Sequence, residues 1–241
     1  MNSNIPVAIL AGGKGRRMRG FDQAQSLCKP LAPIGGRPIL WHVMRTFAAR
    51  GFPTQIVAVG NRGAEVAGFV QGCADEPFSA QAVDTGEDAG TGGRLLRLAE
   101  RLSGGTFFMA WCDGLTDADF GAMLDFHREQ GRLATVLAVR PPERFGLLDL
   151  DGDRAVSFRE KPMDSSRWIN GGVFVLEPQV LDYIEDARVM WERAPLERLA
   201  REGKLAAFRH EGFWRCMDTL CEREQLDDLW EQGRAPWKVW E

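Results

Sequence analysis

The sequence lacks several features that would place it in large classes of protein. Its 241 residues contain no apolar run of eighteen or more, so we expect no membrane-spanning helix. The opening segment, MNSNIPVAIL, has no basic stretch and leads directly into a glycine turn, so we expect no signal peptide. The net charge of −4 provides no overall basic field, which argues against nucleic-acid binding.

The residues that most often bind zinc or form disulfides are few and scattered. The five cysteines form no C-x-x-C pair and are odd in number, which excludes a zinc pattern and a disulfide framework. This usage is typical of a reducing compartment, so we expect a cytoplasmic protein. The three histidines are far apart and each lies beside apolar residues, which disfavours a metal site built from them. The apolar and charged fractions, 44% and 27%, are ordinary for a soluble globular chain.

The most informative segment is PVAILAGGKGRR, residues 6–17. Its apolar run reads as a buried strand that ends at a glycine turn, Gly12-Gly13-x-Gly15. Glycine lets the backbone approach a ligand, with N–H groups directed at phosphate oxygens. Arg16, Arg17 and Lys29 add positive charge where a polyanion would bind. The segment therefore predicts a nucleoside triphosphate site.

The spacing of this turn excludes two commoner nucleotide motifs. A dinucleotide-binding turn would read G-x-G-x-x-G, and a P-loop would end in Gly-Lys followed by Ser or Thr. Here the order is G-G-x-G-x-R, and the lysine of a Lys-Pro pair follows only at position 29.

Strand and helix patterns alternate along the first half, which predicts an α/β fold with a mainly parallel, mixed Rossmann-like sheet flanked by helices. The second half is richer in strands and is expected to be partly antiparallel. We interpret the chain as one domain with a nucleotide-binding half (about 1–135) and a sugar-phosphate-binding half (about 136–241) that ends in a helix. Pro38 is expected to open a helix and Asp117 to cap a later one.

Two aspartates follow apolar segments from distant parts of the chain. Asp113 comes after TFFMAWC, and Asp218 comes after FWRCM. Two carboxylates suit Mg²⁺, which takes one or two protein carboxylates and keeps several waters. Either aspartate alone is as consistent with a turn cap, so the prediction depends on the pair together with the glycine turn.

The second half offers candidates for an acceptor site. Lys161 ends a predicted strand and could hold a phosphate, while Asn170 and Gly171 open the next strand and could bind sugar hydroxyls. Taken alone, Glu-Lys-Pro would be an exposed turn in most proteins.

An ordered set of motifs over nearly the whole chain resembles the sugar-phosphate nucleotidyltransferase family. The motifs are LAGGxGxR, KP, GGRPILWH, VDTGEDxxTGGRL, DG, PPxRFGLLD, FREKP, INGGVFVL, MWExxPLxxLAxxG, GFWxxMDT and APWKVWE. Within this family the chain is most similar to the glucose-1-phosphate cytidylyltransferases. The TGGR and PWKVWE segments are more specific than the glycine turn, which all branches share.

The resemblance implies the Mg²⁺-dependent reaction of CTP with α-D-glucose 1-phosphate to give CDP-glucose and pyrophosphate, in the nucleotide-diphospho-sugar transferase fold. It implies a homo-oligomer that serves polysaccharide biosynthesis. The residues to which it assigns catalysis are Arg17, Lys29 and Asp113. Those assigned to the nucleotide are Leu10, Ala11, Gly12, Gly13, Lys14, Gly15, Arg16, Arg17, Gly93, Arg94 and Cys112, with Arg94 at the cytosine. Those assigned to the sugar phosphate are Lys161, Asn170 and Gly171, and those assigned to the metal are Asp113 and Asp218.

Some positions depart from the family pattern. Arg16 stands where a threonine is usual, Leu27-Cys28 removes one lysine before Lys29, and Cys112 replaces a glycine. The stretch from residue 60 to residue 84 is also shorter than usual. Two alternatives therefore stay open: a different phosphorylated acceptor, whether another sugar phosphate or a non-sugar phosphate or phosphonate, and a silent nucleotide-binding paralogue that regulates a partner. The retained cations and acids argue against the second.

Overall fold

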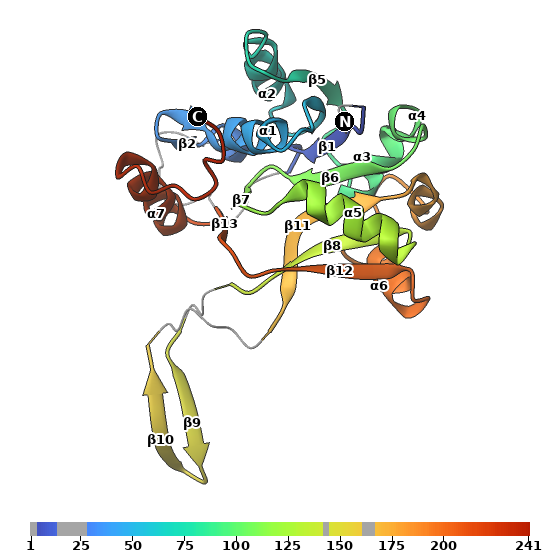
Figure 1. Cartoon of the computed structure of the whole chain (residues 1–241). Coiled ribbons are helices and arrows are strands. Elements are labelled where there is room, and N and C mark those ends of the chain that lie inside the picture. The colour runs from blue at the N-terminus through green and yellow to red at the C-terminus, as the bar shows by residue number, and fades with distance from the viewer. Residues whose placement is uncertain (1–3, 14–27, 142–144, 161–166) are drawn as a thin grey trace.

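The computed structural model describes residues 4–13, 28–141, 145–160 and 167–241. Its centre is a seven-stranded sheet in the order β12-β8-β11-β6-β1-β4-β5 (Figure 1). The strands are β1 (Val7–Leu10), β4 (Thr54–Val59), β5 (Ser79–Asp84), β6 (Phe107–Trp111), β8 (Ala134–Val139), β11 (Ile169–Leu176) and β12 (Leu205–His210). Only β11 runs antiparallel to its neighbours, β6 and β8. The expected mixed, mainly parallel α/β fold is confirmed.

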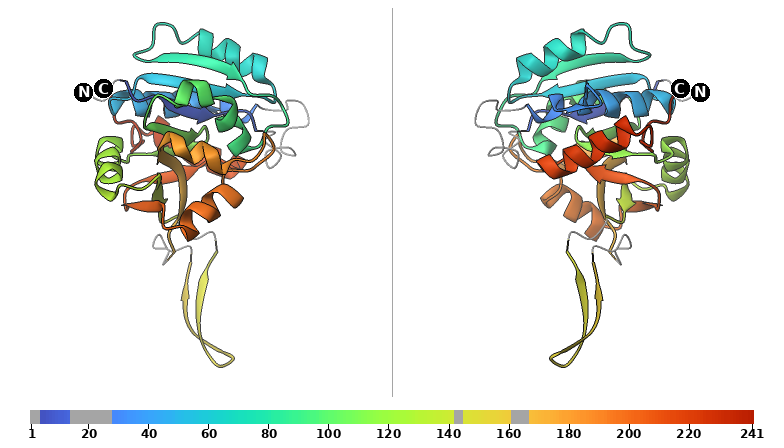
Figure 2. Two further views of the ribbon diagram at one scale, coloured as in Figure 1. Left: turned by 90° about the vertical axis from the view of Figure 1, so that its right-hand side faces the viewer. Right: turned by 90° about the vertical axis from the view of Figure 1, so that its left-hand side faces the viewer.

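Helices cover both faces of the sheet, which explains why β1 (VAIL) and β8 (ATVLAV) are buried along their whole length (Figure 2). One face packs against α1 (Ile39–Ala49), α2 (Gly63–Gln71), α5 (Phe120–Gln130) and α7 (Leu220–Glu231). The other face packs against α3 (Thr91–Arg97), α4 (Ala99–Leu102), the 3₁₀ helix η3 (Pro178–Tyr183) and α6 (Ala194–Arg201). None of the helices among the described residues is long and apolar enough to cross a membrane.

Strands from both halves of the chain share this one sheet, because β11 lies between β6 and β8. Smaller elements complete the framework. They are η2 (Lys29–Leu31), the pair β2 (Pro33–Ile34) and β3 (Arg37–Pro38), and the pair β7 (Gly114–Thr116) and β13 (Trp214–Cys216). The β7–β13 pair matters for function, because it joins the segment after β6 to a segment one hundred residues later.

The expected cap of α5 was wrong by two residues. Asp119, not Asp117, is the N-cap residue, and its side chain accepts a hydrogen bond from the Ala122 backbone N–H. The carboxylate of Asp117 instead accepts from the Phe213 backbone N–H at 2.8 Å and contacts His210 at 2.9 Å. Asp117 thereby fastens the loop after β7 to the loop before β13.

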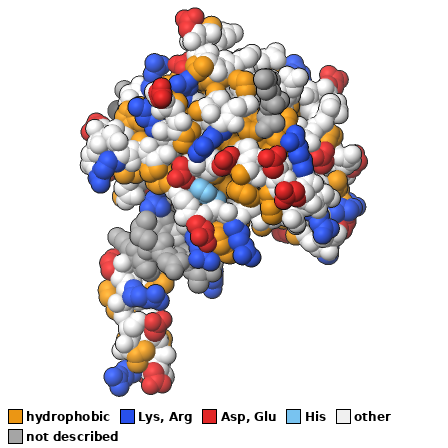
Figure 3. Space-filling view, in the orientation of Figure 1, with side chains coloured by type: hydrophobic (Ala, Val, Ile, Leu, Met, Phe, Trp, Pro, Cys, Tyr) orange, Lys and Arg blue, Asp and Glu red, His pale blue; other side chains and the backbone are white. Residues whose placement is uncertain are grey.

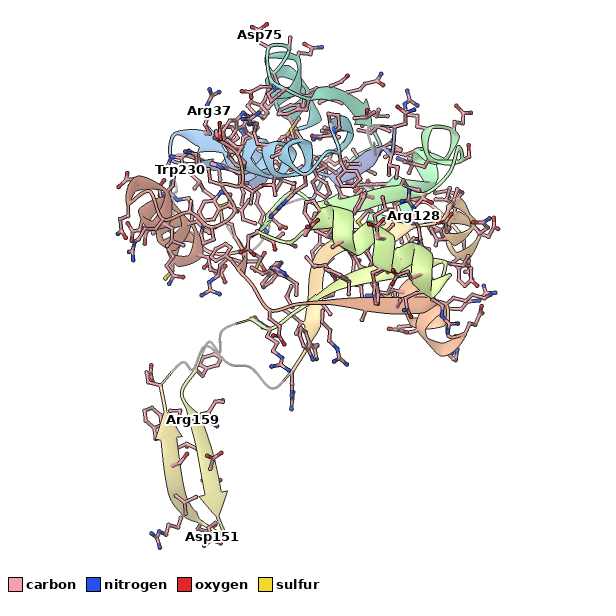
Figure 4. The ribbon with its side chains drawn as sticks, viewed as in Figure 1. Arg37, Asp75, Arg128, Asp151, Arg159 and Trp230 are labelled. Carbon is pink, nitrogen blue, oxygen red and sulfur yellow. The ribbon has the colours of Figure 1, made fainter. Side chains whose placement is uncertain are left out.

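A two-stranded hairpin, β9 (Leu147–Asp151) and β10 (Arg154–Arg159), projects from the body of the molecule in all views (Figures 1 and 2). The sequence indicated strands here but gave no reason to expect them away from the sheet. Asp151 lies at the tip of the hairpin and Arg159 farther back along it (Figure 4).

The C-terminal tail packs on α1 of its own chain, a question that the sequence left open. Trp237 is fully buried, and its indole N–H donates to Nδ1 of the buried His42 at 3.2 Å. Nε2 of the same ring donates to the Ile34 carbonyl at 2.9 Å, so both ring nitrogens are satisfied only in the neutral form. Trp230 of α7 meets His42 edge to face with centroids 4.7 Å apart.

This packing predicts a loss of stability in acid. Burial lowers the pKa of His42 to about 4. Between pH 6.5 and 4 the unfolded chain binds a proton at His42 that the folded chain does not, so stability falls as the pH falls. The full effect is about 3 kcal/mol. The free energies of unfolding of the wild type and of His42→Gln can be measured in urea from pH 7.5 to pH 4. The difference between them should become smaller toward low pH. A difference that stays constant with pH would contradict the low pKa of His42.

Candidate active site

A cavity of about 1250 Å³ opens at the carboxyl ends of β1 and β6. Ligands of open α/β sheets bind at this end of the strands, as we expected for the glycine turn and Asp113. Nine of the residues selected from the sequence line it: Leu10, Gly12, Gly13, Lys29, Arg94, Cys112, Asp113, Asn170 and Asp218.

The ammonium group of Lys29 lies between the carboxylates of Asp113 and Asp218. Its Nζ is 2.5 Å from Asp113 Oδ2 and 2.6 Å from Asp218 Oδ1, and all three side chains are mostly buried. Burial opposes the charge on Lys29, but the two carboxylates outweigh it and hold the pKa of this lysine well above its usual value. Three residues that are distant in the sequence thus form one charged cluster.

Local structure fixes each member of this cluster. Asp113 lies between β6 and β7, and its carbonyl accepts from the Met217 backbone N–H at 2.9 Å, which brings Asp218 alongside. The backbone N–H of Asp218 donates to Glu222, the third residue of α7, in a capping box built on Thr219. Lys29 begins η2. The start of a helix and the end of a strand pair therefore set the distance between the carboxylates.

The donor set fits a magnesium ion. Asp113 and Asp218 already converge on one cationic group, and carboxylate oxygens are the hard ligands that Mg²⁺ prefers. No group of three or more acidic, cysteine or histidine side chains suited to a metal occurs among the described residues. Two carboxylates are nevertheless sufficient for Mg²⁺, which completes its shell with water and substrate phosphates.

Three thiols surround the charged cluster. Cys28, Cys112 and Cys216 are adjacent or nearly adjacent in sequence to the cluster residues, and burial raises the pKa of each. For Cys216 the pKa rises to about 11. Burial thus disfavours the reactive thiolate form of all three.

Arg94 performs a structural task that the sequence did not reveal. Its guanidinium is 3% exposed and donates to the Gly12 carbonyl at 2.7 Å, the Gly86 carbonyl at 2.9 Å and the Thr85 hydroxyl at 2.6 Å. It also donates to the Val59 carbonyl at 3.2 Å. One buried cation on α3 therefore joins the loops that follow β1, β4 and β5, and its role toward cytosine stays a prediction.

The same contacts explain why the glycine turn needs Gly12. A Cβ atom there would lie 2.2 Å from Arg94 Cζ, which no real contact allows. A Cβ atom at Gly13 would have no neighbour within 4 Å among the residues that the structure describes. The first glycine thus makes room for the guanidinium of Arg94, and the second has no such neighbour in the described part of the chain.

The sugar-binding candidates meet at the start of β11. Asn170 lines the cavity, and its Oδ1 accepts from the Gly172 backbone N–H at 2.8 Å. The Gly171 carbonyl accepts from the indole N–H of Trp214 at 2.8 Å. β11 is thereby tied to β13, which precedes Asp218.

Three other selected residues that the structure describes do not line the cavity. Ala11 is buried, Gly93 packs against residues 187–189, and Gly171 packs against β8. The predictions for Lys14, Gly15, Arg16, Arg17 and Lys161 lie outside the described residues.

The sequence did not single out several residues that line the cavity. They are Pro30, Glu87, Asp88, Ala89, Gly90, Thr91, Trp111, Pro141, Phe145, Ile169, Arg188, Met190, Glu192, Arg193, Trp214 and Cys216. The motifs GEDAGT and MWE did contain a part of this set. The sequence did not predict that these two motifs line one cavity, because the segments that contain them meet only in the folded chain.

Comparison with known proteins agrees with this geometry. The profile of the Nucleotidyl transferase family matches residues 7–215. The glucose-1-phosphate cytidylyltransferase of Salmonella typhi is 40% identical, over 98% of this chain and 100% of its own length. A probable glucose-1-phosphate cytidylyltransferase of Bacillus subtilis is 35% identical, again over 98% of this chain and 100% of its own.

A solved structure of a putative glucose-1-phosphate thymidylyltransferase from Bacillus anthracis has a TM-score of 0.73 at 19% identity and covers 93% of this chain and 94% of its own. At that identity the likeness concerns the fold, which is the nucleotide-diphospho-sugar transferase fold expected from the sequence.

The two neighbouring glycines provide a matched test of the turn. Gly12→Ala should displace the buried Arg94 guanidinium and lower the free energy of unfolding by about 3 kcal/mol, the scale for breaking a buried charged network. Gly13→Ala should change it by less than about 1 kcal/mol, because its Cβ meets none of the described residues. Equal stability of the two variants in chemical denaturation would contradict the role given to Arg94.

Proposed function

The chain belongs to the Nucleotidyl transferase family, and from this premise we propose that it converts CTP and α-D-glucose 1-phosphate into CDP-glucose and pyrophosphate. Full-length similarity to glucose-1-phosphate cytidylyltransferases supports this activity. The observation that carries the proposal is the convergence of Asp113 and Asp218 on one cationic group in a cavity at the carboxyl ends of the strands.

The reaction requires alignment and charge neutralisation more than acid–base chemistry. A phosphate oxygen of glucose 1-phosphate attacks the α-phosphorus of CTP in line, and the bond from that phosphorus to the oxygen bridging to the β-phosphate breaks. The acceptor phosphate is already ionised near neutral pH, so no side chain has to remove a proton. The protein has to hold two mutually repelling anions together and stabilise charge at the α-phosphorus.

The residues of the cluster suit this task. Asp113 and Asp218 would hold Mg²⁺, which supplies neutralisation of the phosphate charge when it is bound. Lys29 is kept charged between them and would serve the α-phosphate region. In this proposal Arg17 binds the triphosphate, and the backbone of residues 10–13 faces the base and ribose.

The acceptor would lie toward the second half of the chain. Asn170 lines the cavity there and is held by its contact with Gly172. Lys161 is proposed to bind the phosphate of the acceptor, and Asn170, next to Gly171, to contact the sugar. We propose a cytoplasmic location, where CTP and sugar phosphates occur.

The projecting hairpin supports a homo-oligomer. Leu148, Leu150 and Phe158 are 56%, 64% and 62% exposed, and Phe158 lies directly across from Leu148. The opposite face is polar and carries the bond from Ser157 to Asp149. A lone hairpin is marginally stable in water, so the apolar face favours coverage by a second copy of the chain. Apolar side chains on the hairpin are visible in Figure 3.

The activity is tested by measuring pyrophosphate release with Mg²⁺ and each of the four nucleoside triphosphates, with and without glucose 1-phosphate, and by identifying products by mass. We expect CDP-glucose with CTP. CTP binding without turnover on glucose 1-phosphate would point to another phosphorylated acceptor. Binding of no triphosphate would favour the silent paralogue.

The proposed metal ligands, Asp113 and Asp218, can be tested by substitution. Asp113→Asn should reduce Mg²⁺-dependent turnover by about 10²- to 10³-fold, because one charge at the reacting centre is lost. The melting temperature should stay close to that of the wild type. The control Asp75→Asn, on the exposed surface, should change neither the turnover nor the melting temperature. Turnover at the wild-type rate in Asp113→Asn would remove this residue from the metal site.

Self-association is tested on the hairpin. Phe158→Ser should lower the mass measured by light scattering at micromolar concentration, because it removes the largest side chain of the apolar hairpin face. Ser157→Ala, on the opposite face, should leave the mass unchanged. A wild-type protein that is monomeric at all concentrations would contradict the homo-oligomer.

A further inference from the structure

The segment 187–193 docks on the beginning of α3, and glycines allow the approach. The Gly90 N–H donates to the Ala187 carbonyl at 2.9 Å, and the Gly93 N–H donates to the Val189 carbonyl at 3.1 Å. A Cβ at Gly93 would lie 1.8 Å from the Ala187 oxygen. The backbone of one half of the chain thus lies directly against the backbone of the other.

A single hydroxyl group at this contact makes two further bonds. Thr91 Oγ1 donates to Glu192 Oε2 at 2.6 Å and accepts from the Trp191 backbone N–H at 2.9 Å. The Trp191 ring is fully buried and meets Phe174 of β11 with centroids 5.8 Å apart. The segment is therefore fixed on one side by α3 and on the other side by the central sheet.

The docked segment brings charge to the cavity. Arg188, Glu192 and Arg193 all line it, and both arginines are exposed. Neither arginine forms an ion pair with any described residue, although Glu192 is close in sequence to both. The carboxylate of Glu192 is instead held by the Thr91 hydroxyl.

We propose that Thr91 is a positioning residue that holds Glu192 away from Arg188 and Arg193, so that both cations remain available to the phosphate of the acceptor. The inference rests on the proposed function. Arg193 is the next residue in the chain, and a released carboxylate would pair with a nearby guanidinium and cancel its charge, because opposite charges attract. Although the segment docks beside Gly93, Arg188 and Arg193 line the same cavity as Asn170, which we propose to contact the acceptor, so we assign the effect to the acceptor.

Kinetics of three variants test this role. Thr91→Val keeps the shape and loses both hydroxyl bonds, and it should raise the KM for glucose 1-phosphate about tenfold, the equivalent of one charge-assisted hydrogen bond, with little change in kcat. Thr91→Ser keeps the hydroxyl and should stay within about twofold of the wild type. In Thr91→Val/Glu192→Gln the amide carries no charge to cancel the arginines, so the KM should return toward the wild-type value.

A matched control separates positioning from stability. Thr46→Val also removes a hydroxyl with two bonds, to the carbonyls of His42 and Trp237, on the α1 side of the sheet. This variant should have a lower melting temperature but an unchanged KM for CTP and for glucose 1-phosphate. The proposal is overturned if Thr91→Val shows the same pattern as Thr46→Val, or if adding Glu192→Gln fails to rescue it.

One readout does not depend on turnover. Amide hydrogen exchange across residues 187–193 should accelerate in Thr91→Val and not in Thr46→Val. A wild type that forms no CDP-glucose would count against the proposed function alone. Unchanged exchange in Thr91→Val would overturn the positioning role even in a fully active enzyme.

Discussion

The contact between Lys29 and the pair Asp113 and Asp218 is the interaction on which the site depends. It gathers η2, the end of β6 and the start of α7 at one point, and burial makes the charge of Lys29 costly unless a carboxylate faces it. The β7–β13 pair and the capping box of α7 flank this contact and hold the two carboxylates at a distance that suits one cation.

A second buried cation organises the other end of the cavity. Arg94 ties three strand-end loops together, and the same helix carries Thr91, which docks the segment from the sugar half. The cavity is thus bounded by two fixed centres on rigid elements, as in-line attack between two anions requires.

The fold could be predicted because its pattern is local, and so could the candidacy of Asp113 and Asp218, whose binding of a metal stays a prediction. Alternating apolar runs predicted the sheet, and Asp113 and Asp218 were found because each follows an apolar strand or segment. The tasks of Arg94 and Thr91 could not be predicted, since both depend on backbone carbonyls and a carboxylate brought together only by folding. Asp117 was misassigned as a cap because its true partners, Phe213 and His210, lie about ninety-six residues further on.

The order in which the chain is synthesised gives the C-terminal part of the structure another meaning. β12, Asp218 of the charged cluster and Trp237 of the core are all synthesised long after the glycine turn and Lys29. A nascent chain that has made the glycine turn and Lys29 still lacks the second carboxylate and the tail that covers α1. The charged cluster and the core around α1 can therefore be completed only once these later segments have been made.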